Sequence, residues 1–195
     1  MKKIVYITGN KFKVLTAKKI LEPLGFEIDS KKIDCVEIQD DLIENVANYS
    51  SKYASQLLNE STLKNDSGLV IPALGGFPGP YTHYVEDTLT EDGILKLMSD
   101  KEDREAYFVE VLSYTECGKE PISFISKTEG TIAYEKSGEY GWSYDRIFIP
   151  KGQTKTLACF DDDERWKFWN EDAYEQLAAH LSASNSNKKG KKYTI

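Results

Sequence analysis

A short apolar run, Ile4 to Ile7, stands near the start of the chain and passes through Thr8-Gly9-Asn10 directly into a helical pattern. The run is β-rich and uninterrupted, which is typical of a buried strand. After Asn10, apolar residues recur at spacings of three and four, at Val14, Ala17, Ile20 and Leu21. A strand that leads straight into a helix is a building unit of α/β proteins, so this opening predicts an α/β fold.

The rest of the chain mixes strand and helix patterns in the same way. We predict further strands at residues 26–33, 69–74, 106–114, 122–126 and 131–134. Helical periodicity predicts one long helix from Leu42 to Leu57 and a last helix from Trp166 to Leu181, and Thr90 is a candidate cap for a short helix that ends at Met98. These elements predict a mostly mixed sheet with helices packed against it.

A length of 195 residues suits one domain, or two lobes around one cleft. Residues 1–181 carry all the predicted elements, so we assign them to a single domain. After Leu181 the sequence becomes polar, small and basic, which predicts a disordered tail over residues 182–195. A short basic functional arm is the alternative interpretation of that tail.

The charge and the cysteines exclude several classes of protein. A formal net charge of −7 argues against a nucleic-acid-binding protein, which needs a basic face. Three cysteines without paired spacing favour a reducing compartment and argue against a disulfide framework or a zinc site. We find neither a signal-peptide apolar region nor an 18-residue apolar run, so we expect a cytoplasmic protein that does not enter a membrane.

The segment from Thr8 to Lys13 is the first candidate binding site. A junction of strand and helix presents free backbone N–H groups and the positive end of the helix dipole, and both attract phosphate. Gly9 allows close approach of the backbone, and Lys13 lies one turn into the helix. The simpler alternative is an Asn10 N-cap with a solvated lysine.

Three further segments carry residues suited to a site. In Asn65-Asp66-Ser67-Gly68 a carboxylate sits in a turn before a strand, where it suits Mg²⁺, although a plain Asx turn is the alternative. Residues 75–81 hold three glycines and two prolines, which predicts a stiff turn that a plain hairpin rarely needs. In Gly141-Trp142-Ser143-Tyr144-Asp145-Arg146, aromatic rings beside an acid suit a stacked base, and a core tryptophan with a surface acid is the alternative.

In this order, the four segments resemble the inosine triphosphate pyrophosphatase family, whose members are also called Ham1-like. The chain matches the family motifs T-G-N-x-x-K at Thr8 to Lys13, D-S-G-L at Asp66 to Leu69, and G-F-P-G-x-Y at Gly76 to Tyr81. Weaker matches are Val36-Glu37-Ile38-Gln39, Trp142-Ser143-Tyr144-Asp145 and Ile147-Phe148-Ile149-Pro150. The resemblance runs from about Lys3 to Leu181.

This resemblance implies an elongated mixed sheet with flanking helices, two lobes around a central nucleotide cleft, and a homodimer. It implies hydrolysis of (d)ITP or XTP to the monophosphate and pyrophosphate with Mg²⁺. The residues that it places on the triphosphate are Thr8, Asn10, Lys13 and Lys52, and it adds Ser67 and Gly68 to the substrate-binding residues. It places Glu37 and Asp66 on the metal, with Asp66 and Lys13 in catalysis. It places Trp142, Tyr144, Asp145 and Arg165 around the purine.

The chain departs from the family at two carboxylates and at the base-reading segment. The family has glutamate where this chain has Thr16 and where it has Asn65. The family's E-K-N followed by S-H-R aligns with Glu164-Arg165-Trp166 and then Trp169-Asn170-Glu171. A slipped alignment, or ligands supplied by Asp162 or Asp163, would explain these losses, and so would a protein that binds nucleotide but hydrolyses it poorly.

Three hypotheses follow. The first is an active Mg²⁺-dependent pyrophosphatase with an altered base preference. The second, which we favour slightly, is a sensor that binds (d)ITP and signals to a partner. Antiphage defence of the Kongming type is one context, in which a protein resembling this family detects deoxyinosine triphosphate and works with a sirtuin-like NADase. The third is a structural dimer partner with an empty cleft, which the retained Thr8, Asn10, Lys13, Lys52 and Asp145 make the weakest.

Overall fold

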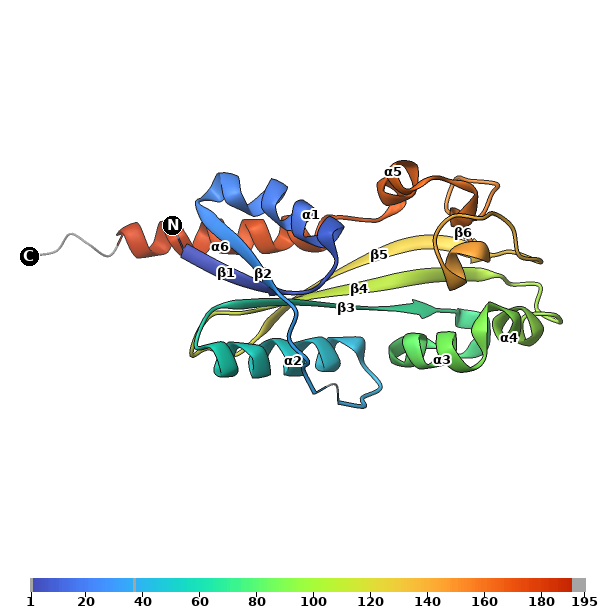
Figure 1. Cartoon of the computed structure of the whole chain (residues 1–195), viewed down its shortest axis with the longest axis horizontal. Helices are drawn as coiled ribbons and strands as arrows, with labels where there is room; N and C mark the ends of the chain where they lie inside the picture. The colour runs from blue at the N-terminus through green and yellow to red at the C-terminus, as the bar shows by residue number, and fades with distance from the viewer. Residues whose placement is uncertain (1, 37, 191–195) are drawn as a thin grey trace, which may run out of the picture.

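Six strands form one mixed sheet in the order β2-β1-β3-β4-β5-β6 (Figure 1). The strands are β1 Lys2–Ile7, β2 Phe26–Lys31, β3 Thr62–Val70, β4 Glu105–Thr115, β5 Ile122–Ile132 and β6 Phe148–Pro150. The strand β1 pairs parallel with β2 and β3, and all the later pairings are antiparallel. This computed structural model describes residues 2–36 and 38–190, with side chains described only to residue 184 at the C-terminal end.

Helices cover both faces of the sheet. On one face lie α1 (Lys11–Leu21), α5 (Asp162–Arg165) and α6 (Asp172–Gly190), and on the other lie α2 (Ile43–Leu58), α3 (Thr82–Thr88) and α4 (Thr90–Leu97) (Figure 1). The molecule is therefore a mixed α/β fold with an elongated sheet and flanking helices, as the sequence predicted. Among the described residues, no helix combines the length and the apolar character needed to cross a membrane.

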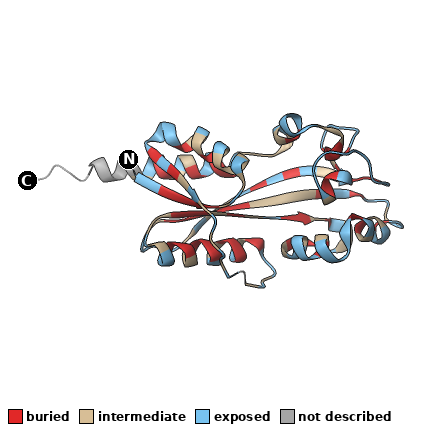
Figure 2. Ribbon diagram, in the orientation of Figure 1, coloured by how far each residue is buried: buried red, intermediate tan, exposed pale blue. Residues whose placement is uncertain are grey.

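The first strand shows why both faces are covered. Ile4 and Tyr6 point to the core under α1 and α6, while Val5 and Ile7 pack with Ala54 of α2. All four are nearly inaccessible, which explains the uninterrupted apolar run, because a strand with helices on both faces has no solvated side. Figure 2 shows the buried residues running along the strands and along α2.

The sheet changes width near its middle. The strand β1 pairs with β3 only over Thr62–Lys64, and β3 then continues beyond the end of β1. The helix α1 begins at this step, so its N-terminus faces the length of β3 that does not pair with β1. A second core, which includes Leu69, Val85, Ile94 and Phe148, fills the lobe built on the far ends of the long strands. The candidate site lies at this step, between the two lobes.

The structure corrects four predictions. Residues 65–68 lie inside β3 and not in a turn before a strand, and Gly68 is needed there because a Cβ atom would collide with the carbonyl oxygen of Gly79. The separate strands predicted at 122–126 and 131–134 are one continuous β5. The predicted helix from Trp166 is broken, because the helical turn of α5 and Trp166–Phe168 ends before α6 starts at Asp172. Asn170 accepts from the Asp172 N–H at 2.7 Å and so marks the new helix start.

The fourth correction concerns the tail. Helix α6 continues to Gly190, past Leu181 where the domain was predicted to end. Extending an existing helix costs far less than nucleating one, so polar residues can continue it. Residues 191–195 of the predicted tail lie outside the described part of the chain.

Candidate functional site

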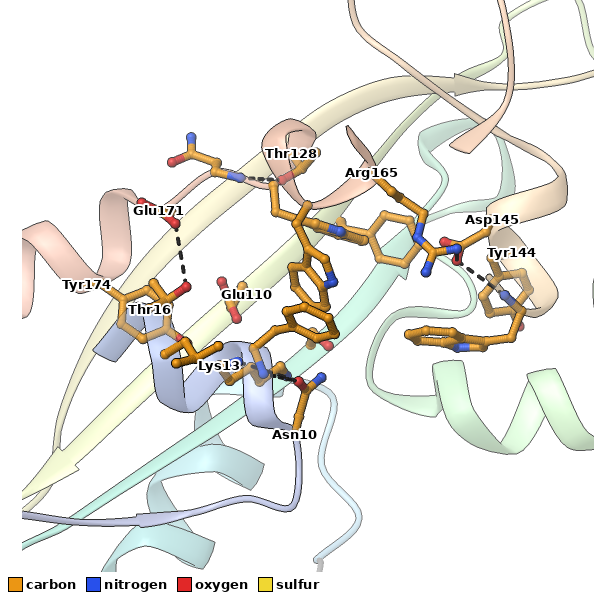
Figure 3. Close-up of a pocket in the computed structure, with 18 of the residues that line it drawn as sticks. Asn10, Lys13, Thr16, Glu110, Thr128, Tyr144, Asp145, Arg165, Glu171 and Tyr174 are labelled. Carbon is orange, nitrogen blue, oxygen red and sulfur yellow. Dashed lines mark hydrogen bonds and ion pairs between the residues drawn. The ribbon is translucent and has the colours of Figure 1, made fainter. Parts of the chain in front are cut away.

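A cavity of about 560 Å³ lies at the step in the sheet, between α1, β4, β5 and the segments around α5 (Figure 3). This volume is in the range of small-molecule and cofactor sites. Lys13, Thr16, Glu110 and Glu171 gather at one end, and Tyr144, Asp145 and Arg165 gather at the other. The cavity thus has two chemically distinct ends, which we call the cation end and the guanidinium end.

The start of α1 forms part of the cation end. Asn10 caps the helix, because its side-chain oxygen accepts from the N–H groups of Phe12 at 2.9 Å and of Lys13 at 3.4 Å. Thr8 in turn accepts from the N–H of Asn10 at 3.1 Å. The N-cap interpretation is therefore correct for Asn10. The solvated lysine that accompanied it is wrong, because Lys13 lines the cavity and burial lowers the pKa of its ammonium.

Lys13 is held by a chain of hydrogen bonds. Its Nζ donates to the side-chain oxygen of Asn65, and the Asn65 amide donates to Glu110 Oε1 at 2.5 Å. Burial raises the pKa of the Glu110 carboxyl, while the nearby Lys13 charge opposes that shift. Sequence reasoning missed Glu110. The available signal was that Glu110 is the single charged residue in the predicted strand Ala106–Tyr114.

A second carboxylate lies beside Thr16. The Thr16 hydroxyl donates to Glu171 Oε1 over 3.5 Å, and Glu171 also lies 3.5 Å from the ammonium of Lys19. Both positions at which the resemblance implies a glutamate, 16 and 65, therefore contact a carboxylate from another part of the chain. These carboxylates are Glu171 and Glu110. Asp162, which the sequence suggested together with Asp163 as a substitute ligand, accepts from Arg165, and a ligand role for either stays a prediction.

At the guanidinium end, Arg165 is sandwiched between two acids. Its Nη1 lies 3.4 Å from Asp145 Oδ2, and its Nη2 donates to Asp162 Oδ1 at 2.6 Å. Arg165 is 5% exposed and Asp145 is 6% exposed. Burial raises the pKa of Asp145 to about 6, although the Trp142 N–H bond and the Arg165 charge act in the opposite direction. Gly141, in the left-handed region at φ 69°, lets the backbone pass where a Cβ atom would collide with this pair.

Aromatic rings line the space between the two ends. Trp142 is 59% exposed, and the Arg165 guanidinium lies 5.6 Å from the centre of its ring. Tyr144 donates to the carbonyl of Thr82 at 3.2 Å. Phe12, next to Lys13, stacks on Trp166, next to Arg165, with ring centres 4.9 Å apart. This stack connects the start of α1 to the segment after α5.

Two buried donors in the cavity wall have unused hydrogen-bonding capacity. Within the described residues, Arg165 Nη1 and Trp166 Nε1 make no hydrogen bond. A buried donor without an acceptor is costly, and such groups in native structures call for a ligand, a water or an ion. The cavity is therefore suited to a ligand that brings hydrogen-bond acceptors.

The structure brings most of the predicted site residues together. The predicted residues that line the cavity are Asn10, Lys13, Ser67, Trp142, Tyr144, Asp145 and Arg165. Among the described residues, the cavity lining does not include Thr8, Lys52, Asp66 or Gly68. Lys52 instead pairs with Glu120 at 2.7 Å.

The predicted metal ligands are described only in part, because Glu37 lies outside the described residues. Asp66 pairs with Val111 across β3 and β4, while Ser67 pairs with Glu110. Side chains alternate along a strand, so Asp66 is on the opposite face of the sheet from Glu110. It still lies close enough for its charge to raise the pKa of Lys13. The described residues include no cluster of three metal-binding side chains.

Comparison with known proteins gives a consistent result. The model of the Ham1 family matches residues 4–179. A dITP/XTP pyrophosphatase of Methanopyrus kandleri is 42% identical over 165 residues, 85% of this chain and 88% of that protein. One of Methanosarcina acetivorans is 45% identical over 154 residues, 79% of this chain and 84% of that protein. The solved Ham1 protein of Staphylococcus aureus superposes with a TM-score of 0.79 at 28% identity, covering 94% of this chain and all of that one.

Proposed function

Because this chain belongs to the Ham1 family, we propose that its cavity binds a non-canonical purine nucleoside triphosphate such as dITP or XTP. The triphosphate occupies the cation end, where Lys13 and the start of α1 meet it. The purine occupies the guanidinium end, against Trp142. Thr8 contributes indirectly by accepting from the N–H of Asn10, and Gly68 by letting β3 pack against Gly79. Lys52 reaches the triphosphate only after leaving Glu120.

The observation that carries this proposal is that Arg165 Nη1 is buried and ion-paired with Asp145 but makes no hydrogen bond within the described residues. A 6-oxopurine presents a carbonyl acceptor at position 6 and an N–H donor at position 1. Arg165 supplies a donor, and the ionised Asp145 beside it supplies an acceptor. Adenine presents the reverse pattern, an amino donor at position 6 and an acceptor at position 1, so it matches neither group. This pair is therefore suited to take over base reading from the missing Ser-His-Arg segment.

We propose further that hydrolysis is weak and that the protein acts as a nucleotide sensor. Position 16 carries a hydroxyl and position 65 an amide, and Lys13 is already bound by Asn65. Asp66 lies across the sheet from Glu110. Positional errors of about 1 Å at a reacting centre can cost on the order of a hundredfold in rate, while binding of the phosphates depends less on such alignment. In that role the occupied cleft signals to a partner protein, for which the resemblance suggests a sirtuin-like NADase in antiphage defence.

An active pyrophosphatase is the alternative, and two observations favour it. Relatives above 40% identity are named dITP/XTP pyrophosphatases. The carboxylates of Glu110 and Glu171 lie beside the two positions that lack them. In that case water attacks the α-phosphorus, and the products are the nucleoside monophosphate and pyrophosphate.

We propose that Mg²⁺ binds with the nucleotide whether the protein is a sensor or an active pyrophosphatase. Asp66 is half-buried on the length of β3 that does not pair with β1, and a site with few carboxylates suits an ion that takes most of its ligands from phosphates and water. Asp66 and Glu37 would hold the ion, which would neutralise charge on the triphosphate. We propose a homodimer, as the resemblance implies, and sedimentation of the purified chain tests it. We also propose the cytoplasmic setting that the cysteines without paired spacing favour.

Calorimetric titration with deoxyinosine triphosphate tests binding. We expect micromolar or tighter affinity in the presence of Mg²⁺, and weaker affinity for adenosine triphosphate. Absence of binding to any purine triphosphate at millimolar concentration would refute the proposal. Pyrophosphate release then separates the sensor from the enzyme.

A further inference from the structure

The amide of Asn65 lies between a cation and an anion. Its oxygen accepts from Lys13 Nζ on one side, and its nitrogen donates to Glu110 Oε1 on the other. An amide is the side chain that can serve both neighbours at once, because it carries an acceptor and a donor on the same planar group. The order of the three groups, ammonium, amide and carboxylate, therefore fixes which way the amide faces.

The sheet register brings the two strand residues together. Glu110 of β4 is directly opposite Ser67 of β3, so Asn65 is its diagonal neighbour on the same face. Asn65 is 9% exposed, and Glu110 is partly buried in the cavity wall. The contact is thus a built feature of two adjacent strands and not a chance meeting of long surface side chains.

We propose that Glu110 is a positioning residue, which acts through Asn65 to hold the Lys13 ammonium at the cation end, and that its presence explains why position 65 carries an amide in place of the family's glutamate. This rests on the proposed function in one respect, which is that Lys13 meets the triphosphate. It goes beyond that function because it assigns a role to a residue that the family motifs do not include.

Electrostatics gives the reason. A glutamate at position 65 would still accept from Lys13, but it would place a second carboxylate against Glu110 in a partly desolvated site. Like charges in such contact disfavour each other's ionised form, and one of them must protonate or move away. Either response releases Lys13 from its present position. With Glu110 in place, an amide at 65 is the compatible choice.

The converse arrangement satisfies the same contacts. If Glu110 becomes glutamine, its amide can donate to a glutamate at 65, and that glutamate accepts from Lys13. The pair Asn65→Glu with Glu110→Gln therefore exchanges the amide and the carboxylate between two strands and keeps the net charge. Each single substitution breaks the order of the groups or changes the charge.

A double-mutant cycle tests the proposal. The proteins are the original chain, Asn65→Glu, Glu110→Gln and the double variant, with Glu129→Gln on the exposed part of β5 as a control outside the cavity. Affinity is measured by calorimetry for deoxyinosine triphosphate and for inorganic tripolyphosphate, which probes the cation end without a base. We expect Asn65→Glu to weaken both affinities at least tenfold when Glu110 is retained, and less than threefold when it is introduced into the Glu110→Gln variant.

The thermal midpoint of each protein is measured without nucleotide, and we expect the double variant to unfold at a higher temperature than Asn65→Glu alone. Equal effects of Asn65→Glu in both backgrounds overturn the proposal, and so does a double variant that fails to fold. If the original chain binds no triphosphate, the proposed function fails, while the coupling in thermal midpoints still reports on Glu110 and Asn65.

Discussion

The guanidinium of Arg165 lies 3.4 Å from the carboxylate of Asp145, and both side chains are almost fully buried. A buried pair of opposite charges needs further hydrogen bonds to offset the loss of water, and here one guanidinium nitrogen still lacks a hydrogen bond among the described residues. A bound 6-oxopurine would complete the arrangement. This pair therefore gives the sharpest test of base recognition.

Asp145→Asn should weaken deoxyinosine triphosphate binding about tenfold, since a hydrogen bond to a charged group contributes roughly 1.5–3 kcal/mol. Adenosine triphosphate should bind as before or better, because an amide can donate to its ring nitrogen. Calorimetry with both nucleotides measures the change. Asp162→Asn is the matched control, because Asp162 contacts the other side of Arg165 and is largely exposed. Equal losses for the two nucleotides would contradict base reading by Asp145.

The affinity should also depend on pH through Asp145. Burial raises its pKa to about 6 from an ordinary 3.8, so the carboxyl is protonated in mild acid and ionised at neutral pH. Binding of deoxyinosine triphosphate should strengthen as the pH rises through about 6 and then level off. Because phosphate groups also titrate near pH 6, the profile is compared with that of Asp145→Asn, which should lack the Asp145 component.

Stability should change in the opposite sense. Between about pH 4 and 6 the folded chain holds more protons at Asp145 than the unfolded chain does. The free energy of unfolding contributed by this group should therefore fall as the pH rises through that window. Denaturant unfolding of the original chain and of Asp145→Asn at several pH values measures the contribution of Asp145 to the free energy of unfolding. A profile that is the same in both proteins would show that Asp145 does not titrate there.

Trp142→Ala should cost roughly 1–3 kcal/mol of nucleotide affinity, by analogy with base–aromatic stacking. The ring is 59% exposed, so its removal should leave the thermal midpoint nearly unchanged. Tyr140→Ala is a suitable control, since Tyr140 is a nearby aromatic residue that is 52% exposed and does not line the cavity. Unchanged affinity for Trp142→Ala would move the base away from this ring.

Lys13→Ala should weaken triphosphate binding at least tenfold, because a charge-assisted contact contributes roughly 1.5–3 kcal/mol. The same change leaves Glu110 without its cation, which should add to the loss. Lys18→Ala, on the same helix but outside the cavity lining, should bind normally. The same affinity for both variants would exclude Lys13 from the phosphate site.

Pyrophosphate release decides between the sensor and the enzyme. With Mg²⁺ and deoxyinosine triphosphate we expect turnover far below the roughly 10 s⁻¹ typical of enzymes. Thr16→Glu with Asn65→Glu should raise it when Glu110→Gln is also present, because that change removes the carboxylate that would otherwise displace Lys13. Turnover of several per second in the original chain would refute the sensor and leave an ordinary pyrophosphatase with unusual ligands.

The sequence predicted those parts of the site that depend on local chain geometry. Asn10 is a helix cap because strand and helix patterns meet there, and nothing distant is needed to recognise it. Trp142 and Asp145 were predicted from a family motif, and both line the cavity. Glu110 could not be predicted in this way, because its contact with Asn65 depends on which residues of β3 and β4 face each other, and that register is set by the whole sheet.

Helical periodicity misplaced Trp166 and Trp169 for a related reason. Their spacing fits the pattern that continues through Leu177, yet the chain leaves the helix at Trp169 and starts again at Asp172. Tertiary packing explains the break, since Trp169 packs edge-to-face on Phe108, and Trp166 stacks on Phe12. A pattern of apolar residues records that they are buried, but not against which element.

The three central strands β3, β4 and β5 run without interruption through both lobes. These strands connect the two lobes directly, so any opening of the cleft must bend or twist a continuous hydrogen-bonded ladder. Such a sheet deforms elastically along its length and does not rotate about a single hinge. A ligand that contacts α1 at one end of the cavity and Arg165 at the other would make the sheet harder to bend. Binding would therefore reduce motion at surfaces far from the nucleotide.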